Sequence, residues 1–199
     1  MTLILGNDAG WAGWGWCLGN EIGPITVGHH ALGGRAWRWS SILGALGELD
    51  QALEAAAHRP DARGQVRVAV EVAPAVYRGR GNQASIGQGM GQIQGAILHW
   101  GTRPGVMLYP WEIGVAEWRA WWGIRACGGR SAYKLAAIRT VIQLGWRARL
   151  EPFADPGPDQ DFGPRGDVAE AILMTVGAAR HPNAAPVGPV RDPAWRVSP

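Results

Sequence analysis

The order of apolar and polar positions along the chain predicts an alternation of strands and helices. Short apolar runs bounded by glycine or proline are typical of strands, whereas apolar residues spaced three and four apart are typical of helices. The pattern predicts strands over 3–8, 14–18, 22–32, 66–71 and 105–109, and helices over 37–57, 84–100, 112–122, 131–144 and 167–179. The first three strands, joined by short Gly-rich links, form a meander. The whole order predicts an α/β fold with a mixed sheet and helices packed on its faces.

Length and composition restrict the class of protein. The chain has 199 residues and 47% hydrophobic content, which suits one domain with a real core. Its longest apolar runs are shorter than the ~18 residues of a membrane span, and its N-terminus does not read as a signal peptide. Two cysteines are too few for a disulfide scaffold or a zinc site. We expect a cytoplasmic protein without a membrane span, with one domain over 1–181 and a Pro-rich tail over 182–199.

The basic residues are concentrated in the middle of the chain. Between positions 62 and 149 there are 12 basic residues and three acids, and Lys134 is the only lysine among the 19 basic residues of the chain. Arginine offers a planar fork of donors that matches phosphate and also stacks on bases. A GC-rich genome would give the same Arg-, Gly- and Trp-rich composition. The composition alone therefore does not indicate a partner, whereas the positions of the basic residues along the chain do. A basic stretch with few acids favours a polyanion as partner.

Four acids stand where the predicted elements could bring them together. Asp8 and Glu71 each end a short apolar strand, and a carboxylate among buried residues is costly unless it is paired or binds a cation. Asp167 and Glu170 are three residues apart and share one face of the last predicted helix. Acids in the first turn of a helix also stabilise its dipole, so helix capping is the alternative interpretation of this pair.

Carboxylate oxygens are the ligands that Mg²⁺ and Mn²⁺ prefer. Two such ions about 4 Å apart can stabilise both the attacking and the leaving oxygen of a phosphodiester displacement. The sequence supplies no other catalytic set, because its five histidines form no HExxH motif and it has neither a GxSxG motif nor a Walker loop.

The chain contains, in this order, the segments ILGNDAG (4–10) with GWGW (13–16), VAVE (68–71), IGQGMG (86–91), SAYK (131–134) and DVAEAI (167–172). Together these segments resemble the motifs of the RuvC-type Holliday-junction resolvases of the ribonuclease-H-like superfamily. The resemblance covers about residues 3–180 and follows the order of the family's motifs. The family usually has Pro where Ala9 stands and Asp where Glu170 stands. The Trp-rich composition and the Pro-rich tail are unusual for the family, and they suggest a bacteriophage or plasmid-borne member.

The resemblance implies a ribonuclease-H-like five-stranded mixed sheet with helices on both faces. It also implies a homodimeric, magnesium-dependent endonuclease that nicks two opposing strands of a four-way DNA junction. Catalysis and the binding of two Mg²⁺ ions, with Mn²⁺ as the alternative, would fall to Asp8, Glu71, Asp167 and Glu170.

Two Gly-rich segments are candidates for DNA contact. Tyr77 lies in the loop after the second acid, where an aromatic side chain could stack on a splayed base, and the two arginines beside it could follow the phosphate backbone. A solvated turn is the alternative interpretation of this loop. The second segment is the Gly-rich loop over 123–130 with the start of the helix predicted after it, and an ordinary helix start with surface charges is its alternative interpretation. The residues expected to contact DNA are Tyr77, Arg78, Arg80, Arg125, Arg130, Ser131 and Lys134.

Two other functions remain open at this point. A non-catalytic module of the same fold that binds branched DNA would be expected to have lost at least one of the four acids. An actin-like or sugar-kinase-like nucleotide binder would share the opening strand, but that class normally has two such domains. The role of the tryptophans over 111–122 also has more than one interpretation, because their spacing suits core packing as well as base stacking or a dimer interface.

Overall fold

The computed structural model describes residues 3–9, 13–31, 43–44, 46–51, 65–72, 107–125, 130–153 and 163–181. The predicted loop over 74–83, the predicted helix over 84–100 and the tail over 182–199 lie outside the described residues. The strands are β1 (Leu3–Ala9), β2 (Gly13–Gly19), β3 (Pro24–Ala31), β4 (Gln65–Val72) and β5 (Met107–Gly114), and the helices are α3 (Val115–Trp121), α4 (Arg130–Gln143), the short 3-10 helix η1 (Arg147–Arg149) and α5 (Gly163–Arg180).

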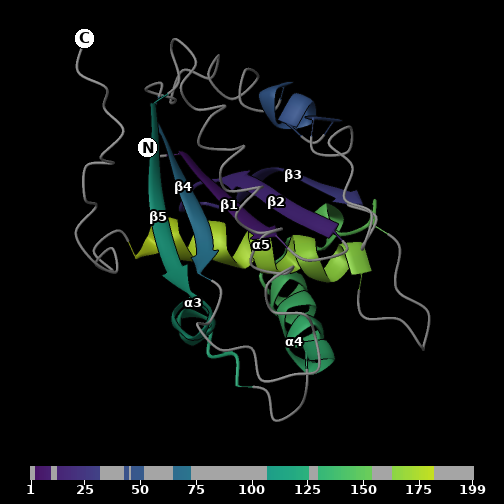
Figure 1. Ribbon diagram of the computed structural model, residues 1–199. Coiled ribbons are helices and arrows are strands. Elements are labelled where there is room, and N and C mark those ends of the chain that lie inside the picture. The colour runs from purple at the N-terminus through teal and green to yellow at the C-terminus, as the bar shows by residue number, and fades with distance from the viewer. Residues whose placement is uncertain are drawn as a thin grey trace, which may run out of the picture.

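The five strands form one mixed sheet in the order β3-β2-β1-β4-β5 (Figure 1). The first three strands pair antiparallel as the predicted meander, whereas β4 lies parallel to β1 and β5 lies parallel to β4. The carboxyl ends of β1 and β4 therefore meet at one edge of the sheet, which is where sites form in sheets with parallel strands.

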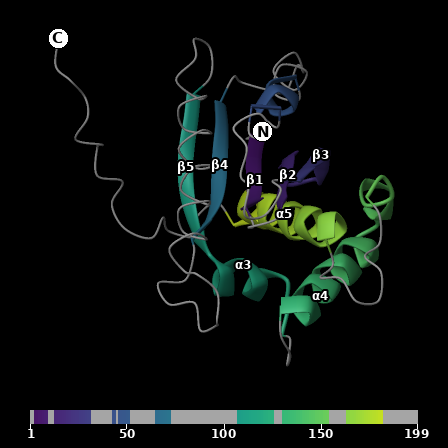
Figure 2. The same ribbon diagram turned by 45° about the vertical axis from the view of Figure 1, so that its right-hand side comes forward.

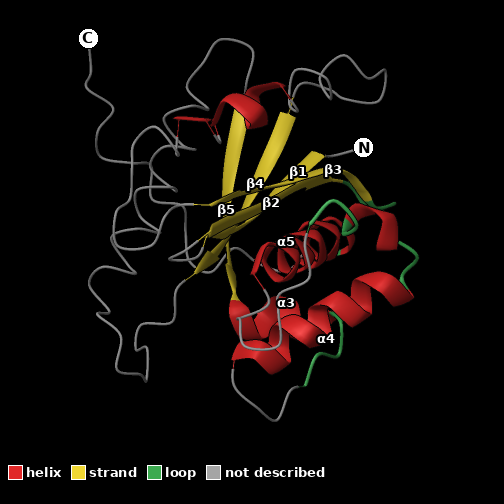
Figure 3. Cartoon of the chain, turned by 90° about the vertical axis from the view of Figure 1, so that its right-hand side faces the viewer, coloured by secondary structure: helices red, strands yellow, loops and turns green. Residues whose placement is uncertain are grey.

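Helix α5 lies directly on the sheet and α4 packs on the outer side of α5 (Figures 2 and 3). The residues of α5 from Gly166 to Ala178 are all buried, as expected for a helix between two layers. No helix in the described part of the chain is long and apolar enough to cross a membrane.

Two neighbouring histidines of β3 show that the sheet is covered on both faces. His29 hydrogen-bonds to Asp167 of α5, whereas the Nε2 of His30 lies 3.6 Å from Glu48 Oε1 in the helical residues 46–51. Because successive side chains of a strand point to opposite faces, these helical residues cover the face away from α5. Strand β2 accordingly is buried along its whole length.

The boundary between β5 and α3, predicted before residue 112, and the start of α5 differ from the sequence-based prediction. Strand β5 continues through Pro110 to Gly114, because an edge strand tolerates a residue without a backbone N–H. Helix α5 begins at Gly163, four residues before Asp167, and has no acid in its first turn. The interpretation of Asp167 and Glu170 as helix-capping acids is therefore wrong.

A glycine on β2 permits the close approach of α5. A Cβ at Gly15 would lie 2.5 Å from the carbonyl carbon of Asp167 and 2.6 Å from its oxygen. These are backbone atoms of a buried helix, so they have little freedom to move.

We expect Gly15→Ala to destabilise the protein by about 2–3 kcal/mol, because the added methyl group would push α5 off the sheet. The measurement is urea unfolding followed by circular dichroism. The control is Gly47→Ala, since a Cβ at this exposed helical position meets no atom within 4 Å. Alanine favours helix over glycine, so the control should be neutral or stabilised by up to ~1 kcal/mol. Equal effects of the two substitutions would contradict the close approach.

Candidate active site

The floor of the candidate site is a row of register partners across the sheet. Asp8 of β1 pairs with Gly15 of β2, and Gly15 pairs with His29 of β3. On the other side of β1, Asn7 pairs with Val70, so the backbone of Glu71 follows at the register position beside Asp8. The side chain of Glu71 lies outside the described part of the structure.

Asn7 anchors this end of β1 to both neighbouring strands. Its side-chain amide donates to the carbonyls of Leu5 and Ala69 at 3.4 Å, and its carbonyl oxygen accepts a hydrogen bond from Trp14 Nε1 at 3.1 Å. Because all of these groups are buried, the backbone that carries Asp8 is held firmly in place.

Three carboxylates converge on the ammonium group of Lys134. Its Nζ lies 3.2 Å from Asp8 Oδ2 and 3.1 Å from Glu170 Oε2, and it also donates to Asp167 Oδ1. Asp8 comes from β1, Lys134 from α4, and the other two acids from one face of α5. The structure thus brings together three of the four acids that the sequence predicted to share a site, around a lysine that is only 2% exposed.

The electrostatics of this cluster favour the fully charged state. Burial by itself would lower the pKa of Lys134, but Asp8, Glu170 and Asp167 together raise it well above its usual value. Burial would likewise raise the pKa of Asp167, yet the hydrogen bonds from His29 and Lys134 bring this pKa below 3.8, its usual value. The lysine therefore stays protonated and Asp167 stays ionised at neutral pH.

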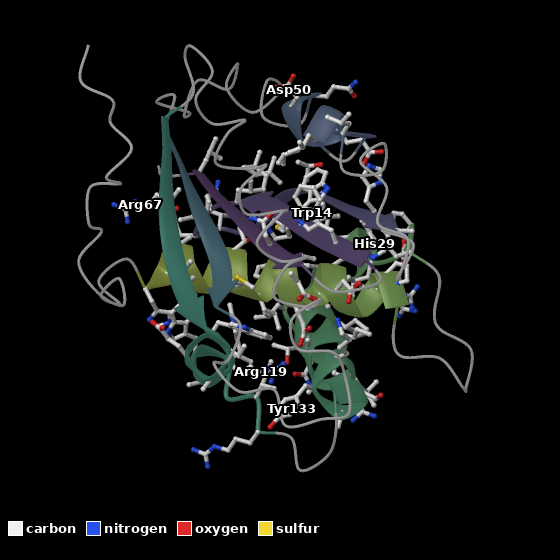
Figure 4. The ribbon with its side chains drawn as sticks, in the orientation of Figure 1. Trp14, His29, Asp50, Arg67, Arg119 and Tyr133 are labelled. Atoms are coloured by element: carbon white, nitrogen blue, oxygen red, sulfur yellow. The ribbon has the colours of Figure 1, made fainter. Side chains whose placement is uncertain are left out.

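Arg119 of α3 holds the second oxygen of Glu170. Its Nη2 lies 3.1 Å from Glu170 Oε1, and its Cζ lies 4.0 Å from the ring centre of Tyr133 and 5.1 Å from that of Trp118 (Figure 4). Stacking on two rings orients the fork of donors. Trp118 is completely buried, so this member of the Trp-rich segment is a core residue.

Sequence reasoning missed two residues of the cluster, His29 and Arg119. His29 Nε2 lies 3.0 Å from Asp167 Oδ2, although the two residues are far apart in the chain. A signal for His29 was its place on a strand that neighbours the Gly-x-Gly segment of β2. No local signal separates Arg119 from the other arginines, because its role depends on where α3 packs against α5.

The donor chemistry of the site fits a divalent cation. Asp8, Asp167 and Glu170 each present an oxygen to one positive centre, and carboxylate oxygens are ligands of Mg²⁺ and Mn²⁺. Among the described residues, the acids meet on the ammonium group and no three His, Cys, Asp or Glu side chains are arranged as a metal-ligand set. The residue types are thus those a cation requires, with Lys134 as the positive charge at their centre.

The residues expected to contact DNA have different positions in the structure. Arg125 and Ser131 are exposed, and Arg130 is the first residue of α4. Lys134 differs from the expectation of a surface phosphate contact, because its ammonium group is buried among carboxylates. Tyr77, Arg78 and Arg80 lie outside the described residues.

The fold is that of known Holliday-junction resolvases. RuvC of T. thermophilus, solved in complex with a Holliday junction substrate, superposes with a TM-score of 0.51 and 14% identity over 92% of this chain and 95% of that chain. The yeast mitochondrial Holliday junction resolvase Ydc2 gives a TM-score of 0.50 and 13% identity over 89% of this chain and 77% of that chain. No protein-family model and no curated protein matches the sequence.

Replacing Lys134 tests whether its ammonium group holds the cluster together. We expect Lys134→Met to cost about 3–5 kcal/mol in EDTA at pH 7, because it leaves buried carboxylates without their shared cation. The measurement is urea unfolding. Arg139→Met, at an exposed position of the same helix, should change stability by at most ~0.5 kcal/mol.

Acid should reduce the difference between wild type and Lys134→Met. A carboxylate whose pKa is lowered by folding contributes stability above its unfolded pKa, and this contribution is lost as the pH falls through the folded pKa. For Asp167 the loss in the wild type therefore begins near pH 4 and grows as the pH falls. A difference between the two proteins that stays constant from pH 7 to pH 3 would contradict this assignment.

Proposed function

We propose that this protein is a structure-selective endonuclease that resolves four-way DNA junctions with divalent metal ions, as a homodimer that makes paired nicks. The observation that carries the proposal is the convergence of Asp8, Asp167 and Glu170 on one buried centre within a resolvase-like fold. A fold alone does not specify a function, so the site has to supply the argument.

The metal ligands of the proposal are Asp8, Glu71, Asp167 and Glu170. Asp8 and Glu71 are supported by their adjacent register positions on β1 and β4, and the other two by their common face on α5. When bound, two Mg²⁺ or Mn²⁺ ions would neutralise charge on the phosphodiester and activate water as the nucleophile.

The other residues of the cluster hold the acids in position for this chemistry. Lys134 keeps three carboxylates close together that would otherwise repel one another. Arg119 occupies Glu170 Oε1 and leaves Oε2 directed toward the centre of the cluster. Such preorganisation supplies much of the rate enhancement in phosphoryl transfer, because the protein contributes little covalent chemistry.

DNA binding in this proposal relies on residues around the site. Arg130 is the first residue of α4, and the exposed side chains of Arg125 and Ser131, close to it in the chain, can reach phosphates. Arg78 and Arg80 would follow the backbone near the crossover, and Tyr77 would stack on a splayed base. We assign catalysis to residues 1–181, and the similarity to RuvC over 92% of the chain supports this extent.

Asp8→Asn should lower junction cleavage by at least ~100-fold while junction binding stays near the wild-type level, because the amide keeps the shape and removes a ligand charge. The measurement is cleavage of a labelled four-way junction in Mg²⁺, with a linear duplex of matched sequence as the substrate control. Glu151→Gln, which removes an exposed carboxylate, should cut normally. Wild-type rates for Asp8→Asn would refute the metal assignment, and wild-type protein that binds junctions without cutting would favour a non-catalytic module.

The double substitution Arg78→Ala with Arg80→Ala should weaken junction binding and reduce the slope of log K against log salt concentration by about 2, or one unit for each lost phosphate contact. The measurement is fluorescence anisotropy at several salt concentrations. Arg67→Ala serves as the control, since Arg67 is exposed and lies apart from His29 and Arg119 in Figure 4. An unchanged slope for the double variant would place both arginines off the DNA.

A further inference from the structure

The ring of His29 reaches Asp167 across strand β2 through a gap that glycine leaves open. A Cβ at Gly13 would lie 2.4 Å from His29 Nε2 and 2.7 Å from Cε1, and 3.1 Å from Asp167 Oδ2. Gly15, the register partner of His29, has the backbone of Asp167 directly above it. The two glycines of the Gly-Trp-Gly segment therefore create the space in which the imidazole and the carboxylate meet.

The two oxygens of Asp167 have different partners. Oδ2 lies 3.0 Å from His29 Nε2, and Oδ1 is held by Lys134 at the centre of the cluster. An ionised carboxylate accepts hydrogen bonds only, so the Nε2 of His29 carries the proton and donates it. Because the side chains of His29 and Asp167 are only 9% and 10% exposed, this hydrogen bond is shielded from competing water.

The neighbouring histidine provides an internal comparison. His30 follows directly on β3 but belongs to the opposite face of the sheet, where its partner is Glu48, whose side chain is 54% exposed. The alternation of side chains along a strand thus directs one histidine into the acid cluster and the other to the far helix. The contact of His29 is specific to the site.

We propose that His29 is a positioning residue, which fixes Asp167 through Oδ2 so that Oδ1 is directed toward Asp8, Glu170 and the cation they would share. The inference rests on the proposed function, since it assigns the cation to the same acids. It adds to the four proposed metal ligands a fifth residue, which supports the site without binding the cation. Removing a residue that hydrogen-bonds to a metal ligand commonly weakens metal affinity by ~10–100-fold.

The test is the dissociation constant for Mn²⁺ and for Mg²⁺, measured by titration calorimetry on the full chain without DNA. His29→Phe keeps an aromatic ring and removes the donor, and we expect it to weaken cation binding by ~10-fold or more. His29→Gln places an amide N–H near the position of Nε2 and should recover most of the affinity. His30→Phe is the matched control on the opposite face and should bind the cation as the wild type does.

A substitution at a third residue, Gly13, tests the hydrogen bond between His29 and Asp167. Gly13→Ala puts a methyl group where the ring of His29 lies, so it should displace the imidazole from Asp167 and weaken cation binding in the same direction. In the His29→Ala background, which has no ring to displace, Gly13→Ala should lose most of its effect. This double-mutant cycle measures the contribution of the His29 ring to cation binding even if His29→Phe fails to fold.

The outcomes separate this inference from the proposed function. Wild-type cation affinity in both His29→Phe and Gly13→Ala, with junction cleavage intact in the wild type, would overturn the role of His29 alone. Weakened cation binding in these variants, with a wild type that cuts no junction, would support His29 and refute the nuclease. A wild type that binds neither Mn²⁺ nor Mg²⁺ would overturn both.

Discussion

The ammonium group of Lys134 holds one end of the molecule together electrostatically. It contacts Asp8, Asp167 and Glu170 and so ties α4 and α5 to β1. Three buried carboxylates would repel one another strongly at this spacing, since charges interact with little screening away from water. All three acids therefore share one positive charge, and the layers of sheet, α5 and α4 have to stack so that this charge reaches each of them.

Around this centre, each acid of α5 is held at its outer oxygen by a separate donor. His29 from β3 holds Asp167, and Arg119 from α3 holds Glu170. The inner oxygens are left to face Lys134. Elements on opposite sides of α5 thus fix the orientation of both carboxylates, which is the kind of support that metal and catalytic sites require to keep their geometry.

Glycine on β2 makes this arrangement sterically feasible. Helix α5 lies so close to the sheet that a methyl group at Gly15 would overlap the backbone of Asp167. The absence of a side chain at Gly13 likewise leaves room for the ring of His29 to reach Asp167 across β2. A motif that resembles a family signature in the sequence therefore has a direct physical role, because it sets the distance between the sheet and the helix that carries two of the acids.

Much of the fold followed from local pattern. Apolar runs, glycines and prolines predicted the meander, strand β4 and helix α4, because these signals act within a few residues. The boundaries of β5 and α5 did not follow, since an edge position that accepts Pro110 and a helix start at Gly163 depend on neighbours distant in sequence. Asp8, Asp167 and Glu170 are acids within apolar segments, and this pattern was sufficient to predict that they share a site. Only tertiary structure decided that Lys134 points inward to bind them and that His29 and Arg119 complete the cluster, because these contacts join residues 33 to 138 positions apart and no local pattern records which side chains a packed helix brings together.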